Sequence, residues 1–252
     1  RHSQLSEFYP YRYLASEGFL PGYNFTRLPI RVFIPNSSTG GEYISRPKHI
    51  ALREFGPLNI IYYNGQKYKV KQLIAQNIEE SLFKAKVATP SGYFLIGKDE
   101  DREFCPFSGA DLSKSRNKTM VHDLLELSES RTEASERITC EEEERTSRGF
   151  EISTYFYVEG GDQSVKNATA KSDDDSFLRL RYVPAARLVY VSKGWRSQKT
   201  EGFPINTITG NWRTHMPNED DGIQDPEKYK LVRLITTNTA DSLYIEPIQV
   251  LG

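Results

Sequence analysis

Two arginines that lie two positions apart form the clearest chemical pattern in the sequence. Arg179 and Arg181 belong to a run with strand character, so their side chains fall on one face of the strand while Leu178 and Leu180 fall on the other. Arg187 follows a few positions later. A guanidinium group matches the geometry of a phosphate and can donate several hydrogen bonds to it. The spacing therefore predicts a phosphate-binding face formed by Arg179, Arg181 and Arg187.

A second basic group lies at the start of an expected short helix. Arg46 and Lys48 precede the helical residues, and the free N–H groups of a helix start also favour anions. Further along the chain, Trp195 and Trp212 each have an arginine as the next residue, and rings beside positive charge can stack on nucleic-acid bases. The pattern predicts phosphate contact by the two basic residues and base stacking by the two rings. The alternative interpretation is a solvated strand face with core tryptophans.

The cysteines, Cys105 and Cys140, raise the question of a metal site. The run that begins at Cys105 has the outline of half a zinc knuckle, but Ser108 occupies the position of the second thiolate. Only Cys140 and His122 remain as plausible partners of Cys105, so the sequence does not supply a complete site with four ligands. We therefore expect no metal ligands and no zinc in this segment. Two cysteines form at most one disulfide, and a chain of this size folds without one, which fits a reducing compartment.

Catalytic signatures are missing from the sequence. It contains no Gly-rich phosphate loop ending in Lys-Ser/Thr, no Gly-x-Ser-x-Gly elbow, no His-Glu-x-x-His and no dinucleotide fingerprint. Cys140 with one of the four histidines could form a nucleophile pair, but we favour a buried thiol and surface histidines. The acidic run 141–144 is interpreted as charge at a helix N-terminus. We expect a segment without catalytic residues.

The composition is that of a globular protein. The 252 residues are 37% apolar, 27% charged and 12% aromatic, and 33 basic against 34 acidic residues give a formal charge of −1. This balance removes the bulk electrostatic argument for nucleic-acid binding, although a local basic face remains compatible with it. No apolar run approaches the ~20 residues of a membrane span, and no signal peptide is evident. We expect a cytoplasmic protein without membrane contact, cut from a longer chain because it begins with Arg1.

Alternation of apolar and polar residues predicts a mainly β chain. Asn64-Gly65 lies between two β-rich runs and predicts a hairpin over 59–70. Short helices are expected over 4–17, over 47–55 with Ser45 as its cap, and after Thr139. Polar loops are expected over 98–115, 160–175 and 218–227, and 120–127 is open between strand and helix. The remaining strands are expected over 28–34, 81–89, 93–96, 151–158, 176–183, 187–191, 229–236 and 242–249.

These elements define the expected fold class. About ten strands against three short helices predict an α+β, mainly β architecture, with antiparallel sheets or a partly open barrel and a few short helices. A division into residues 1–58, a helix-turn-strand segment, and residues 59–252, a β-rich domain, is one organisation, and a single domain is the other.

The order of several motifs resembles a known family. The run 13–25, the segments 42–46 and 51–57 and the later Tyr62 and Lys67-Tyr68 are similar to the region after the motor domains of large superfamily-2 DEAD/DEAH-box helicases. The relatives concerned have a C-terminal domain of unknown function, and some occur in bacterial antiphage loci such as DISARM. Residues 138–145 and 149–152 also resemble a stretch found there, after a cysteine-rich segment. The resemblance covers most of the first 160 residues and is specific in the first 70.

The resemblance implies an accessory role for the chain. Residues 1–58 would pack on the motor and 59–252 would form an accessory domain that guides single-stranded or duplex DNA or docks a second defence subunit. ATP and Mg would bind at a motor upstream of Arg1, because no ATPase motif lies within these residues. Relatives often have paired cysteines where this chain has Cys105 and Ser108, which weakens the zinc role that the family implies. The alternative is a protein-interaction scaffold without nucleic-acid contact, favoured by the near-zero charge and acidic loops.

Overall fold

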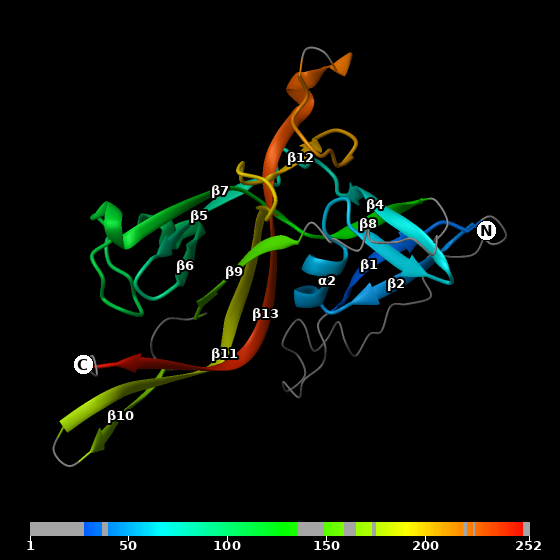
Figure 1. Cartoon of the computed structure of the whole chain (residues 1–252). Coiled ribbons are helices and arrows are strands. Elements are labelled where there is room, and N and C mark those ends of the chain that lie inside the picture. Colours follow the sequence, from blue (N-terminus) through cyan, green and yellow to red (C-terminus); the bar gives the residue numbers. More distant parts are fainter. Residues whose placement is uncertain are drawn as a thin grey trace.

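The computed structural model describes most of the chain and contains two β-rich units (Figure 1). The described residues are 28–36, 40–135, 149–158, 165–172, 175–218, 221–223 and 225–248. The helix expected over 4–17 and the helix expected after Thr139 lie outside these ranges, as does Cys140.

The first unit is a half-barrel of five strands. Its order is β2-β1-β8-β4-β3, and β1 pairs antiparallel with β2 but parallel with β8. The β3–β4 hairpin confirms the Asn-Gly prediction, because Asn64 and Gly65 both have positive φ, as the turn requires. Its strands are β1 (Ile30–Ile34), β2 (Glu42–Arg46), β3 (Ile60–Tyr63), β4 (Gln66–Ile74) and β8 (Glu129–Ala134).

The second unit is a closed barrel of six strands. Pairing runs through β11-β9-β6-β5-β7-β13, and an additional β11–β13 ladder returns to the first strand. Strand β10 (Lys166–Ser172) pairs with β11 outside the barrel, and β12 (Phe203–Asn206) pairs with β13. The barrel strands are β5 (Phe83–Ala88), β6 (Tyr93–Ile96), β7 (Lys118–Glu126), β9 (Phe150–Tyr157), β11 (Asp175–Trp195) and β13 (Tyr229–Pro247).

Apolar side chains fill the barrel and also the space between the two units. Val189, Val191 and Ile235 from β11 and β13 lie in the barrel core. Helix α2 (Lys48–Glu54) contributes Ala51 and Leu52 to a larger core with residues of β1, β4 and β13. Helix α2 therefore packs between the half-barrel and the outside of the barrel (Figure 1). The 3-10 helices described are η1 (Gly97–Asp101), η2 (Ser115–Asn117) and η5 (Pro226–Lys228).

Strand β11 contains a bulge where it leaves the barrel. The register with β13 shifts between Val183 and Ala186, and Ala185 has a φ of 51°. The Asp241 carboxylate accepts hydrogen bonds from the Ala185 N–H and the Tyr182 hydroxyl, both at 2.9 Å. These bonds hold the pKa of Asp241 below its ordinary value, and the bond to Asp241 raises the pKa of Tyr182. One carboxylate thus holds the extra residue in place.

Beyond the bulge, three strands continue as an arm. β10, the first part of β11 and the last part of β13 extend together past the barrel (Figure 1). We define the arm as residues 166–172, 176–183 and 242–247. The bulge exchanges the two faces of β11, because Val183 and Ala186 stand opposite residues on the same face of β13. After the bulge, the odd-numbered residues Val189 and Val191 face the barrel core. Before the bulge, the odd-numbered residues Arg179 and Arg181 lie on the opposite face of the sheet.

The fold class expected from the sequence is confirmed. The described chain is mainly β, with antiparallel and mixed sheets and α2 as the α-helix of the described residues. Residues 120–126 form part of strand β7 rather than a helix, and Leu127 follows the end of that strand. Two pairs of expected strands are joined into single long strands, β11 and β13, and the expected loop 160–175 contains β10. Ser45 does not cap α2, since Pro47 occupies the N-cap position without a side-chain hydrogen bond.

Two further findings concern domain organisation and membrane contact. Strand β1 pairs with β8, so the half-barrel sheet crosses the boundary expected at residue 58. Among the described residues, no helix is long and apolar enough to cross a membrane.

Ala185→Gly is expected to stabilise the protein by about 1 kcal/mol. A positive φ costs an L-residue roughly 1–2 kcal/mol, and glycine avoids that cost but loses somewhat more backbone entropy on folding. Urea denaturation of both proteins measures the difference. Ala134→Gly is the control, because Ala134 is exposed in β8 and has ordinary strand geometry. This substitution should destabilise the protein, since glycine is unfavourable in a strand. Equal effects of the two substitutions would contradict a strained bulge.

Candidate functional site

The arm places Arg179 and Arg181 on one face, as the sequence predicts. In the ladder, Arg179 stands opposite Glu246 of β13 and Thr169 of β10, and Arg181 stands opposite Asn167. Directly opposed residues of a sheet point to the same side. The face therefore combines two guanidinium groups, one carboxylate, an amide and a hydroxyl.

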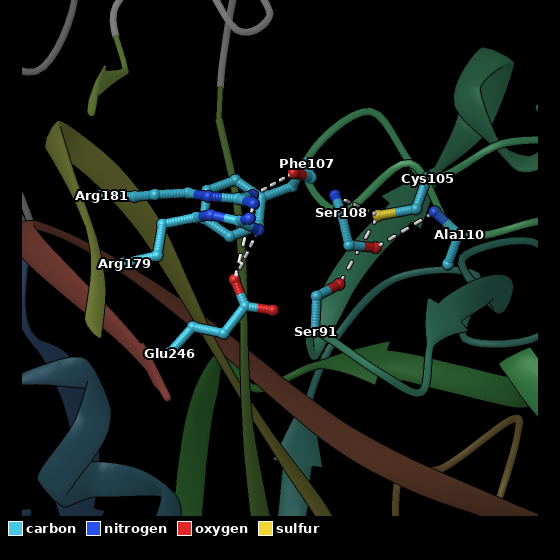
Figure 2. A network of polar contacts seen from close by, with 8 residues as sticks. All are labelled: Ser91, Cys105, Phe107, Ser108, Ala110, Arg179, Arg181 and Glu246. Carbon is cyan, nitrogen blue, oxygen red and sulfur yellow. Dashed lines mark hydrogen bonds and ion pairs between the residues drawn. The ribbon is translucent and has the colours of Figure 1, made fainter. Parts of the chain in front are cut away.

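Glu246 forms ion pairs with both arginines (Figure 2). Its Oε2 atom lies 3.1 Å from Nη1 of Arg179 and 3.6 Å from Nη2 of Arg181. The Arg179 side chain is 46% exposed and that of Arg181 is 14% exposed, so the two arginines differ in their access to a ligand. One carboxylate neutralises only one of the two positive charges, and the face keeps a net positive charge.

Arg181 is also held by Phe107, which belongs to the loop after η1. Its Nη1 donates a hydrogen bond to the Phe107 carbonyl oxygen, and its guanidinium lies 4.7 Å from the centre of the Phe107 ring. The ring in turn makes edge contacts with Phe156 and Tyr244. Figure 2 shows Arg181 in front of this ring. Arg181 is therefore held by Phe107 as well as by Glu246, whereas Arg179 is paired with Glu246 and is the more exposed of the two.

Cys105 organises the turn that bears Phe107. The thiol is buried, its sulfur accepts the Ser108 N–H at 3.4 Å, and it lies 3.5 Å from Oγ of Ser91. The Gly109 N–H donates to the Cys105 carbonyl at 2.8 Å. Among the described residues, no cluster of three or more His, Cys, Asp or Glu side chains is arranged to hold a metal. The half-knuckle motif thus forms a tight turn here, in which the backbone N–H of Ser108, the residue at the position of the missing second thiolate, donates to the Cys105 sulfur.

A pocket opens between the arm and this turn. Its volume is about 480 Å³. The arginines of β11, residues of the exposed strand β10 and Phe107 contribute to its lining. The lining residues are Phe107, Val165, Asn167, Ala168, Thr169, Arg179 and Arg181.

The other predicted basic residues lie elsewhere. Nε of Arg46 lies 2.7 Å from Glu54, and Nζ of Lys48 lies 3.3 Å from Glu126. Both are at the junction of β2 and α2, on the half-barrel side of the molecule, whereas β10 lies at the end of the arm (Figure 1). Their charges are engaged with carboxylates, and helix α2 has only seven residues. The structure does not bring Arg46 and Lys48 together with the arm arginines.

Arg187 does not extend the face of Arg179 and Arg181. It lies beyond the bulge, where it shares the face of Val189, and Val189 points into the barrel core. The sequence predicts separate strands over 176–183 and 187–191, and it contains no signal that Pro184 and Ala185 include an inserted residue that exchanges the faces of one long strand. The expected face of three arginines is therefore reduced to Arg179 and Arg181, because the bulge places Arg187 on the other face of the sheet.

Trp195 and Trp212 both lie in the core between the two units. Their exposed fractions are 2% and 5%, and each ring packs edge-on against Phe203, with centroid distances of 4.8 and 6.3 Å. A ring with so little exposed surface offers no face to a nucleic-acid base. We assign both tryptophans to the core, in line with the alternative interpretation of the sequence.

Sequence reasoning missed several residues of the pocket. Asn167 and Thr169 carry no motif, Phe107 belongs to a run interpreted only as half a metal site, and Glu246 lies beside the pocket as the ion-pair partner of its arginines. Glu246 could be placed in an expected strand, but its pairing with Arg179 depends on which strand lies beside it. Comparisons with protein-family models, with curated proteins and with solved structures find no match for this chain.

Trp195→Ala and Trp212→Ala are each expected to lower the free energy of unfolding by about 3–5 kcal/mol, the cost of removing a buried aromatic ring. DNA affinity per folded molecule should stay unchanged, because neither ring reaches the surface. Urea denaturation gives the stability, and fluorescence anisotropy with labelled DNA gives the affinity. Weakened DNA binding by a fully folded, scarcely destabilised Trp variant would contradict the core assignment.

Proposed function

We propose that the chain is a non-catalytic accessory region of an ATP-dependent DNA helicase or translocase that works in bacterial antiphage defence. Its role would be to guide a DNA strand. The family resemblance of the sequence suggests the motor, which would lie upstream in the same protein, bind ATP and Mg, and act in the cytoplasm. A second defence subunit is a further partner that the resemblance suggests.

The observation that supports strand guidance is the arginine face of the arm. Arg181 is pre-positioned by Phe107, and Arg179 is half exposed and donates a hydrogen bond to Glu246. A guanidinium carries five N–H groups, so one such bond does not exhaust its donors. Positive charge beside a pocket attracts phosphate with little dependence on sequence. A module that guides a moving strand needs this kind of contact.

Replacing Arg179 and Arg181 together by Glu is expected to weaken DNA binding at least tenfold and to flatten its salt dependence. Each phosphate contact that is lost lowers the salt slope by about 0.7 on a single strand. Fluorescence anisotropy of labelled single-stranded and duplex DNA at low and moderate salt measures both quantities. Arg179→Glu alone should show a smaller effect in the same direction and leaves the Phe107 contact intact.

The matched control reverses two exposed charges away from the arm. Lys98 in η1 and Lys199 in the loop before β12 are both exposed, and replacing both by Glu changes the net charge by the same amount. We expect this control to lose much less affinity than the arginine double variant. Equal losses would show that DNA responds to overall charge alone, and unchanged affinity in a folded arginine variant would remove the assigned contact.

The opposite face of the arm favours the second candidate, a protein-interaction scaffold without nucleic-acid contact. Leu243 and Ile245 of β13 are 56% and 55% exposed, and they stand opposite Tyr182 and Leu180. Large apolar side chains that lie together on a surface are typical of protein contact sites. Absence of salt-dependent DNA binding would shift the assignment to this face.

Leu243→Thr combined with Ile245→Thr is expected to change the free energy of unfolding by less than about 1 kcal/mol. Both side chains are more than half exposed, and threonine has the β-branched shape that strands favour. DNA affinity should remain that of the parent protein, because the arginines point to the other side. Urea denaturation and anisotropy check the two statements. A loss of several kcal/mol would place this face in a core and remove the observation that favours the scaffold.

A further inference from the structure

The pocket beside the arginines has a definite size and a mixed lining. Its volume of about 480 Å³ falls within the ~300–1,000 Å³ of pockets that hold small ligands. Phe107 contributes an aromatic ring to the lining, and the lining residues Asn167, Ala168 and Thr169 of β10 are exposed. A concave site of this size can admit one unstacked nucleotide, whereas a duplex keeps its bases stacked inside the helix.

The charges that face the pocket select the kind of anion. Arg179 and Arg181 contribute two positive charges, and Glu246, which forms ion pairs with both, contributes one negative charge. The remaining single positive charge balances one phosphodiester group. A terminal phosphate, which carries about −1.5 to −2 charges at neutral pH, would leave an excess of negative charge beside the Glu246 carboxylate.

Uncharged polar groups lie next to the arginines on the same face. Asn167 stands opposite Arg181 and Thr169 stands opposite Arg179, and both line the pocket. The Asn amide has donors and an acceptor, and the Thr hydroxyl can act as either. Such groups hydrogen-bond to the edge of an unstacked base, which only a single strand presents. Charge and hydrogen-bonding groups thus lie within the space of one nucleotide.

We infer that this pocket holds one nucleotide of a single strand, with its phosphodiester at Arg179 and Arg181 and its base edge at Asn167 and Thr169. The inference rests on the proposed function and deepens it, because it assigns to the arm a preference for single-stranded over duplex DNA. Glu246 limits the strength of the contact by occupying part of both guanidinium groups.

The test compares single-stranded and duplex DNA on the whole 252-residue chain. The probe is a labelled thymidine oligonucleotide of about 20 nucleotides, longer than the ~4–16-nucleotide sites of single-strand binding folds, and a duplex of equal length. We expect the single strand to bind about tenfold more tightly. Asn167→Ala with Thr169→Val should remove most of that preference, because two lost hydrogen bonds correspond to about tenfold in affinity.

One further variant, in which Glu246 loses its charge, separates hydrogen bonding from charge. The polar double variant should keep the parent salt slope, since it changes no charge, whereas Glu246→Gln should tighten single-strand binding by removing the competing carboxylate. Thr200→Val is the matched control, because Thr200 is exposed in a loop outside the pocket lining and should have no effect. Oligonucleotides with and without a 5′-phosphate should bind alike.

The outcomes distinguish failure of the inference from failure of the proposed function. Equal affinity for single strand and duplex, with both lowered by reversal of Arg179 and Arg181, would overturn the nucleotide pocket and leave the DNA contact standing. Binding that requires a 5′-phosphate would overturn the phosphodiester assignment. No binding of either DNA at low salt would overturn the proposed function and the inference together.

Discussion

The antiparallel pairing of β11 with β13 is the interaction on which the rest of the structure depends. At one end it closes the six-stranded barrel, and at the other it extends past the barrel as the arm that β10 completes. A single ladder therefore joins a packed core to an exposed sheet. The core can fix the position of the arm because Val189, Val191 and Ile235 of the same two strands lie inside the barrel. No separate linker is needed to hold the arginine face beside the Phe107 turn.

The bulge at Ala185 resolves a conflict that such a continuous ladder creates. Without an inserted residue, the face of β11 that points into the barrel core would continue in the arm as the face that bears Arg179 and Arg181. The extra residue, held by Asp241, exchanges the faces, so the side that packs on the barrel exterior becomes the side that bears Arg179 and Arg181. Val183 and Ala186, on either side of the insertion, pack with Phe107 in one outer cluster. That cluster brings the turn and the arm together, and the pocket lies at its edge.

The sequence predicted the parts of this structure that depend on local patterns. Alternation of apolar and polar residues predicted most strands and the shared face of Arg179 and Arg181, and Asn64-Gly65 predicted the hairpin. These features could be predicted because they depend on residues that are neighbours in the sequence. The bulge could not be predicted, since Pro184 and two alanines resemble a break between strands and their continuity depends on Asp241, far along the chain. The pocket was missed for the same reason: its walls are joined by strand register and tertiary packing, for which no local pattern exists.

The shared carboxylate of Glu246 reconciles a basic site with a nearly neutral protein. A face that carried several free arginines would hold a polyanion tightly and depend strongly on salt. Here one carboxylate engages both guanidinium groups, and the burial of Arg181 against Phe107 limits how far that side chain can move. If the arm guides a strand as proposed, each phosphate must be released as readily as it is captured, because the strand moves past. A pocket with one net positive charge meets that requirement better than an uncompensated arginine pair would.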